Sequence, residues 1–509
     1  MVRRKRGPSL AVVLLVAALV TGCTTGDGDA PFTAAAAETA STRPPSTTTT
    51  TAPPTTTTTV ALPPPAPIAW APCGGGFQCA TTDVPVDYEN PGGATLSISL
   101  IKRPASEPGE RIGTLIMNPG GPGASGVNRV RRGFSISDEV AARFDIVGFD
   151  PRGVGQSTPV SCGAAVDAFR STDLGPDDEQ ESTALELAAR AVAEECTATE
   201  GERLAHLGTV EVVRDLEVIR RNLGEPQISF VGLSYGTLIG LLWADAFPTS
   251  VRAMVLDGVS DPAAVSSAMA STQVVALEDA FAEVDAACAA DPACPFSAQG
   301  RRLLDAYDEL AAQVEQGAGA GSGVGPTQLA YAAFSATYGT DRWAPLWHAV
   351  DKGLAGDLSD VARLSAWFTG LVDYVPFALV NCLDAPHPLG FEAWQENARA
   401  AAERSPRFGA VAANELLPCA FWPSTTRTVA PVDAPGAPPI LVVGSTGDVA
   451  TPYAQAEQVA ADLESGVLLT VDMAGHVAIG DSDCAEAAIT RYLVDLAPPP
   501  PGTRCAADG

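Results

Sequence analysis

Residues 231–238 read VGLSYGTL, which places a serine between two glycines at the spacing G-x-S-x-G. An apolar run typical of a buried strand, 228–233, leads into Ser234, and an apolar helical pattern, 237–248, follows it. Side chains at positions 232 and 236 would collide in so sharp a turn, and glycine removes that crowding. Such a turn exposes the Ser234 hydroxyl above the sheet, at the positive end of the helix. The pattern predicts a nucleophilic serine; the alternative is a chance match in a glycine-rich chain.

A serine hydroxyl is a weak nucleophile and needs a general base. The chain has four histidines. His206 precedes the serine, against the order serine, acid, histidine that accompanies this kind of turn, and His348 and His387 fall in a helical insertion. His476, in AGHVAIG, follows the apolar run 468–472 directly. His476 is therefore the predicted base, and a histidine without a catalytic role is the alternative.

The acid that orients the base should follow the preceding strand. The segment PILVVGSTGDVATP, 439–452, places Asp448 in a glycine-bounded loop after an apolar run. A carboxylate there would hold the imidazole in the required tautomer and stabilise the imidazolium. Asp472 and Asp481 lie too near His476 in sequence to come from another strand. An aspartate that only forms a turn is the alternative for Asp448.

An acyl-transfer reaction also needs two backbone N–H groups for the developing oxyanion. We expect the first from Tyr235, the residue after the nucleophile. The second should come from the loop NPGGPGASG, 118–126, where glycines let the main chain approach the substrate. Gly121 is the first choice and Gly120 the second, against the alternative of an ordinary turn-forming loop.

Short apolar runs that end in Gly-, Asp- or Asn-containing turns predict the strands that position these residues. The runs are 113–118, 144–150, 228–233, 252–257, 439–445 and 468–473. Before them, 95–101 alternates between apolar and polar residues, which predicts an antiparallel strand. A helix is predicted over 209–224, with Thr209 as its cap and Gly224 as its stop. This alternation indicates a mostly parallel α/β sheet that is covered on both faces.

The alternation breaks between about 260 and 430, where the chain is alanine-rich and helical in pattern. We interpret this region as a helical cap inserted between two strands. The predicted organisation is a core in two parts, 70–258 and 431–509, with the cap insertion at 259–430.

The first residues predict export. VRRKRG and an apolar stretch of 11 residues precede VTGC, which is similar to a lipobox with Cys23 as the lipidated residue. We expect residues 1–22 to be a lipoprotein signal peptide; an ordinary signal peptide with an incidental Cys23 is the alternative. Residues 23–69 contain the Thr/Pro tract 41–67 and predict a disordered tether. The enzyme would then be a cell-surface lipoprotein or a secreted protein.

Ten further cysteines, an even number in an exported chain, predict disulfides between sequence neighbours. Ten cysteines allow many pairings, and the set with the shortest loops is Cys73–Cys79, Cys162–Cys196, Cys288–Cys294, Cys382–Cys419 and Cys484–Cys505. A zinc site is the rival interpretation, but the chain has no C-x-x-C and few histidines. We expect no metal and no cofactor. The net charge of −29 argues against nucleic-acid binding, and we expect a monomer.

Several of these motifs together resemble a family. NPGGPGASG, FDPRGVGQS, GLSYGTLIGLLWADAFPTSVRAMVLDGVSDP, VNCLD with CAFWP, GSTGDVATP and AGHVAIG are similar to the secreted tripeptidyl aminopeptidases of actinobacteria. These are α/β-hydrolases related to proline iminopeptidases, and the resemblance runs from about residue 70 to the C-terminus. It implies an α/β-hydrolase fold with an inserted helical cap and the triad Ser234, Asp448 and His476.

The resemblance implies a serine exopeptidase that releases short peptides or single residues from free N-termini. Pro119 stands where proline iminopeptidases carry a histidine, so proline specificity is not implied. A desolvated substrate ammonium needs a charged partner, and Asp384 is the candidate, ahead of Asp373. An exposed loop aspartate is the alternative for Asp384. Asp150 and Arg152, in DPRG, are expected to have structural roles.

Two other functions fit the same residues. A carboxylesterase or lipase passes through the same acyl-enzyme, so the triad does not distinguish it from a peptidase. A tethered binding module with an idle triad is the third hypothesis; the presence of all three triad members and of the glycine loop argues against it.

Overall fold

The structure of the protein, a computed structural model, describes residues 62–264, 267–319, 321–423 and 431–506. All of them belong to one compact unit, Thr59–Gly509. The signal peptide, Cys23 and all but the last residues of the tether lie outside the described residues.

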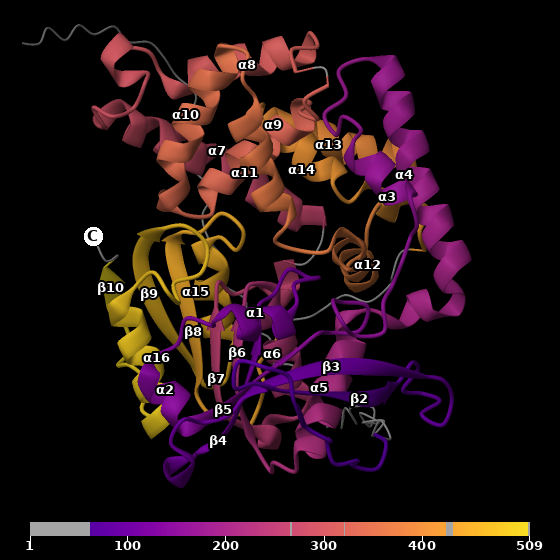
Figure 1. The fold of residues 1–509 in the computed structure, drawn as a ribbon, viewed down its shortest axis with the longest axis vertical. Helices are drawn as coiled ribbons and strands as arrows, with labels where there is room; N and C mark the ends of the chain where they lie inside the picture. Colours follow the sequence, from indigo (N-terminus) through magenta and orange to yellow (C-terminus); the bar gives the residue numbers. More distant parts are fainter. Residues whose placement is uncertain (1–61, 265–266, 320, 424–430, 507–509) are drawn as a thin grey trace, which may run out of the picture. The chain divides into compact units, whose positions relative to one another are not determined.

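A ten-stranded sheet forms the centre of this unit (Figure 1). Its order is β1-β2-β3-β5-β4-β6-β7-β8-β9-β10. All pairs from β5 through β10 are parallel, whereas β1, β2 and β3 form an antiparallel edge on β5. The strands are β1 Ala71–Pro72, β2 Gln78–Pro85, β3 Thr95–Arg103, β4 Gly113–Asn118, β5 Phe144–Phe149, β6 Ile228–Leu233, β7 Val251–Asp257, β8 Ile440–Gly447, β9 Gly466–Ala474 and β10 Arg504–Ala506.

All seven predicted strands are confirmed, with ends that agree within two residues, and 95–101 is antiparallel as predicted. The strands β1, β2 and β10 were not predicted. In the parallel strands successive side chains enter opposite layers: Ile116 packs into one hydrophobic cluster, and Leu115 and Met117 into another. Burial on both faces is the reason that these strands appear in the sequence as continuous apolar runs.

Helices cover both faces of the sheet. The cluster on one face includes side chains of α5 (Thr209–Leu223), α6 (Tyr235–Ala246) and α15 (Tyr453–Asp462). The cluster on the other face includes α1 (Gly126–Arg132), α2 (Asp138–Arg143) and α16 (Asp483–Asp495). Gly224 ends α5 in a left-handed conformation, as predicted, but the helix is capped by Gly208 and not by Thr209.

The described chain between β7 and β8 contains helices and no strand, and Figure 1 shows these helices gathered beyond one end of the strands. They are α7 Ser267–Ala290, α8 Leu303–Glu315, α9 Pro326–Thr337, α10 Trp343–Leu354, α11 Ser359–Thr369, α12 Tyr374–Asp384, α13 Phe391–Arg404 and α14 Gly409–Asn414, followed by the 3-10 turn η7 Leu417–Phe421. Contacts join this helical cap to loops at the carboxyl ends of the strands. Gly339 pairs with Gly475 after β9, and the Asp373 N–H donates to the Gly123 carbonyl after β4.

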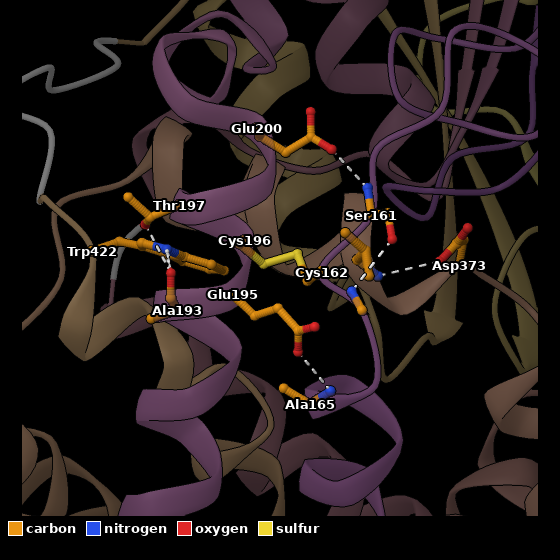
Figure 2. The surroundings of a disulfide bond; sticks show 12 residues. Ser161, Cys162, Ala165, Ala193, Glu195, Cys196, Thr197, Glu200, Asp373 and Trp422 are labelled. Carbon is orange, nitrogen blue, oxygen red and sulfur yellow. Dashed lines mark hydrogen bonds between the residues drawn. A yellow bond between two sulfur atoms is a disulfide. The ribbon is translucent and has the colours of Figure 1, made fainter.

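The segment after β5 also joins the cap, through α3 (Ala165–Arg170) and α4 (Glu179–Glu200), whose apolar side chains lie in the cap's hydrophobic cluster. Figure 2 shows the Cys162–Cys196 disulfide that fastens this segment to α4, with the Ser161 N–H donating to the Glu200 carboxylate at 2.8 Å. The indole N–H of Trp422, from the end of the cap, donates to the carbonyl of Ala193 on α4 at 3.1 Å. The helical layer therefore draws on residues before β6 as well as on the predicted insertion.

All five predicted disulfides are present in the structure. Five disulfides are typical of a protein that folds in an oxidising compartment, as an exported protein does. Among the described residues no single helix is long and apolar enough to cross a bilayer; α11 and α12, bent by 50° at their junction, pass that test only as a pair.

The DPRG loop after β5 has the expected structural role. Arg152 forms a buried ion pair with Asp215 of α5, at 2.6 Å, and not with Asp150. Asp150 accepts hydrogen bonds from the Ser125 hydroxyl and the Val127 N–H at the start of α1. The two residues therefore hold different helices against the edge of the sheet.

Candidate active site

Ser234 occupies the turn between β6 and α6, with φ 55° and ψ −130°. A serine with positive φ is strained, and such strain persists where the surrounding structure holds it in place. Every residue from Ile228 to Leu241 is buried except Ser234, which is partly exposed. The turn therefore delivers one hydroxyl to an accessible position at the positive end of a helix.

The glycines around Ser234 are needed for space. A side-chain carbon at Gly232 would lie 2.5 Å from the Gly236 carbonyl oxygen, and one at Gly236 would lie 2.6 Å from the Asn118 carbonyl oxygen. The crowding predicted for both positions is confirmed. A carbon at Gly120 would lie 2.9 Å from the Ser234 Cβ, so the loop after β4 approaches the turn as closely as backbone atoms permit.

His476 and Asp448 lie together in loops after neighbouring strands. Nδ1 of His476 is 2.9 and 2.8 Å from the two Asp448 carboxylate oxygens. A carboxylate only accepts, so in the neutral imidazole Nδ1 carries the proton and Nε2 is left to accept one. Asp448 also accepts from the N–H groups of Ala450 and Thr451 and from the Thr451 hydroxyl, which fix the carboxylate.

The loop that carries His476 is anchored by Asp257, the last residue of β7. The Asp257 carboxylate accepts hydrogen bonds from the N–H groups of Ala478 and Ile479, the closest at 2.8 Å. Between them and the histidine, Val477 has a strained φ of 74°. These two hydrogen bonds to one buried carboxylate fix the backbone of residues 476–479 and keep the His476 ring in place.

The charges around His476 favour its protonated form. Burial lowers the pKa of His476, but the charge of Asp448, its hydrogen bond and the charge of Asp257 raise it, and the net pKa lies above the ordinary value. Burial raises the pKa of Asp257 to about 6, although the Ala478 and Ile479 N–H groups lower it. The site is therefore suited to stabilise an imidazolium that forms during a reaction.

Ser234 and His476 both contact the short segment Asp257–Gly258 at the end of β7. The Ser234 N–H donates to the Asp257 carbonyl at 2.9 Å. A side-chain carbon at Gly258 would lie 3.0 Å from Cε1 of the His476 ring. The structure thus brings the loops of Ser234, Asp448 and His476 together at the carboxyl ends of β6, β8 and β9.

The predicted oxyanion donors are Tyr235, directly after Ser234, and a glycine of the loop after β4 that approaches Ser234. The Gly120 N–H is already engaged, since it donates to the Asn118 side-chain oxygen at 2.9 Å. Within the described ranges, the N–H groups of Gly121 and Tyr235 donate no hydrogen bond. These two uncommitted N–H groups favour Gly121 over Gly120 as the partner of Tyr235.

A cavity of about 570 Å³ opens between Ser234 and the cap. Apolar and aromatic side chains from α7, α9, α11, α12 and α13 form much of its wall. Four charged residues also line it: Arg170, Asp384, Arg404 and Glu415. A cavity that is apolar with a few charged groups suits a ligand with an apolar body and a charged end.

Asp384 lines this cavity, but its carboxylate has partners. It accepts hydrogen bonds from the N–H and the hydroxyl of Thr209, at the start of α5. The Thr209 hydroxyl in turn meets the hydroxyl of Tyr235. Asp384 therefore links the cap to the residue after the nucleophile. Asp373, the weaker candidate, caps α12 through the Val375 N–H.

A family profile described as "alpha/beta hydrolase fold" matches residues 113–483. The chain belongs to the α/β-hydrolase family. The match spans the strands that carry Ser234, Asp448 and His476, and the expected fold, a mostly parallel sheet with a helical cap, is confirmed.

Named relatives of this α/β-hydrolase include peptidases and an esterase. The "Serine protease Hip1" of Mycobacterium tuberculosis is 33% identical, over 86% of this chain and 91% of that protein. The "Carboxylesterase B" of the same organism is 36% identical, over 84% of this chain and 86% of that protein. The "Tripeptidyl aminopeptidase" of Streptomyces lividans is 32% identical, over 84% of both chains. The protein is a hydrolase, and the resemblance to the tripeptidyl aminopeptidases is confirmed.

The structure also adds residues to the hydrolase site that the sequence did not single out. Asp257 stands in VLDG as the last residue of a predicted strand, and this position was a usable signal. Tyr338 stacks edge to face on His476 with 5.5 Å between ring centroids, and Glu415 lines the cavity. Neither Tyr338 nor Glu415 belongs to a recognisable motif, so only the packing of the cap reveals them.

Proposed function

We propose that the protein is a serine exopeptidase that hydrolyses peptide bonds near free N-termini, with Ser234, His476 and Asp448 as its triad. The observation that carries the proposal is the orientation of His476: its Nδ1 faces Asp448, while its ring packs against the segment that binds the Ser234 backbone. Relatives named tripeptidyl aminopeptidase and serine protease support peptides as substrates.

In the proposed reaction His476 Nε2 takes the proton of the Ser234 hydroxyl as Oγ attacks the scissile carbonyl carbon. The carbonyl oxygen becomes an oxyanion that accepts from the N–H groups of Gly121 and Tyr235. The imidazolium is stabilised by Asp448 and gives its proton to the leaving amine. Water, deprotonated by His476, then hydrolyses the acyl-enzyme and restores the serine.

A carboxylesterase is the second candidate, because one relative carries that name and the cavity wall is rich in apolar side chains. The deciding experiment gives wild type and Ser234→Ala aminoacyl and tripeptidyl p-nitroanilides beside nitrophenyl esters. We expect amide hydrolysis by wild type that N-acetylation of the substrate suppresses. Ester turnover without any amide turnover would overturn the peptidase proposal, and equal turnover of N-acetylated amides would remove its exopeptidase part.

We further propose that Cys23 is lipidated and anchors the exported enzyme to the outer face of the membrane. Two or more acyl chains on one cysteine are sufficient for stable membrane attachment. Cells that express Cys23→Ser should release the enzyme into the medium, whereas wild type should sediment with membranes. Wild type found wholly in the medium would contradict the anchor.

A further inference from the structure

Glu415, in the turn between α14 and η7, lines the cavity, and its carboxylate is weakly hydrogen-bonded. Its Oε1 is 3.4 Å from the Tyr331 hydroxyl, which is long for a hydrogen bond. No ion pair in the described part of the chain involves this carboxylate. Burial raises the pKa of Glu415 to about 7, although the charge of Arg170 and the Tyr331 hydroxyl lower it. A poorly compensated carboxylate in a cavity is a binding site for a cation.

The surroundings of Glu415 contain one positive charge and two phenols. Arg170 of α3 lines the same cavity, but its guanidinium lies over the Tyr374 ring, 5.6 Å from the centroid. The Tyr374 hydroxyl is used by the Glu415 backbone carbonyl, at 2.7 Å. Arg170 thus stabilises the ionised form of the Glu415 carboxylate without forming an ion pair with it.

Asp384 is the other carboxylate of the cavity, and the sequence made it the first candidate for the substrate ammonium. Its two oxygens accept from the N–H and hydroxyl of Thr209, so part of its bonding capacity is spent on the start of α5. The Cys382–Cys419 disulfide joins the segments that carry Asp384 and Glu415. One bridge therefore positions both carboxylates, and Glu415 is the one with bonding capacity to spare.

We propose that Glu415 binds the ammonium group of the substrate's free N-terminus and thereby sets the length of the peptide that is released. This inference rests on the proposed function, for which it supplies the receptor of the N-terminus.

The length follows from α9. Tyr338 packs on His476, and Tyr331, seven residues earlier, has its hydroxyl beside Glu415. Seven residues of helix rise about 10 Å. Phe334, between them on the same face, lines the cavity together with Tyr338, and Glu415, beside the Tyr331 hydroxyl, lines it as well. An extended peptide covers about 10 Å with three residues. A carboxylate at Glu415 therefore favours the release of a peptide of about three residues over a single residue.

The test uses the full chain and p-nitroanilides of alanine, dialanine and trialanine, each with a free or an acetylated N-terminus. Glu415→Gln removes the charge and keeps the shape. We expect wild type to prefer the free trialanyl substrate. Glu415→Gln should lower kcat/KM for that substrate about 100-fold, mainly through KM, and leave the acetylated substrate and nitrophenyl acetate unchanged. Glu283→Gln, on an exposed part of α7, is the matched control and should behave as wild type.

Different failures point to different errors. Absence of amide hydrolysis by wild type contradicts the proposed function itself. If Glu415→Gln hydrolyses amides with the same preference for a free N-terminus as wild type, only the role of Glu415 is contradicted. The same holds if Asp384→Asn loses that preference and Glu415→Gln keeps it. Glu415→Asp keeps the charge and is the second variant in case Glu415→Gln does not fold. Glu415→Asp should retain the preference for a free N-terminus, and loss of that preference in Glu415→Asp would also overturn the proposal.

Discussion

The backbone N–H of His476 donates to the carbonyl of Tyr338 at 3.3 Å, and the two rings meet edge to face with 5.5 Å between their centroids. Tyr338 ends a helix of the cap, whereas His476 follows a strand of the sheet. The proposed base is therefore held by the cap as well as by the core. A movement of α9 moves the histidine directly, so the cap is part of the catalytic geometry and not only a cover over it.

The Tyr338 contact predicts a difference between two substitutions. Tyr338→Phe keeps the ring, and its kcat/KM should stay within about twofold of wild type. Tyr338→Ala removes an aromatic pair whose contribution is about 1 kcal/mol, so kcat/KM should fall about fivefold for ester and amide substrates alike. Steady-state kinetics on one ester and one amide measure this; equal activity of the two variants would show that the ring does not position His476.

Ser234→Ala should reduce hydrolysis of every substrate by about 10⁶-fold, because the proposed nucleophile is lost. The variant should also no longer be labelled by a fluorophosphonate that reacts with activated serines. The control is Ser359→Ala, on an exposed turn of the cap, which should be labelled as wild type. Residual labelling of Ser234→Ala would identify a different nucleophile.

Asp448→Asn should lower kcat about 10⁴-fold, because an amide beside Nδ1 stabilises the wrong tautomer of His476. The matched control is the rival carboxylate Asp472, which forms an exposed ion pair with Arg504. Asp472→Asn should leave kcat unchanged. The opposite ranking of the two variants would contradict the assignment of the acid.

The pH dependence of activity should reflect the buried charges. His476 must be neutral to accept a proton, so activity falls as the pH drops through its pKa, which lies above the ordinary value near 6.5. The Asp257 charge raises the pKa of His476. Asp257→Asn removes that charge and keeps an acceptor for the loop, so the acidic limb of kcat/KM should move to lower pH. An acidic limb that stays in place or moves to higher pH would be inconsistent with this electrostatic account.

Removal of the Cys382–Cys419 disulfide by double serine substitution should affect both stability and substrate binding. Its two cysteines are 37 residues apart, which corresponds to a loss of about 4 kcal/mol in unfolding free energy. The Cys484–Cys505 bridge spans 21 residues between α16 and β10, and its removal should cost about 3 kcal/mol. Both variants should have a lower Tm, but only the first should raise KM for peptides with a free N-terminus. Equal KM values in both would show that the first bridge does not position the cavity carboxylates.

Much of the fold was predictable because its signals are local. The strands β4 and β6 match the predicted runs 113–118 and 228–233 residue for residue, since strands buried on both faces must be continuously apolar. The short edge strands β1 and β10 were not predicted, because two or three residues carry no periodicity. The cap of α5 was misplaced by one residue, because the Thr209 hydroxyl bonds to Asp384 and Tyr235 and not to the first turn of the helix.

The sequence by itself determined the strand, turn and helix around Ser234 and the chain order of the proposed triad. Each of these depends on residues close together in the chain, whose spacing restricts what the backbone can do. Only the tertiary structure decided that Asp257 holds the His476 loop, that Tyr338 packs on the ring, and that Glu415 faces the cavity. These contacts join segments far apart in the chain, and they exist only after hydrophobic burial has packed the helical cap against the sheet.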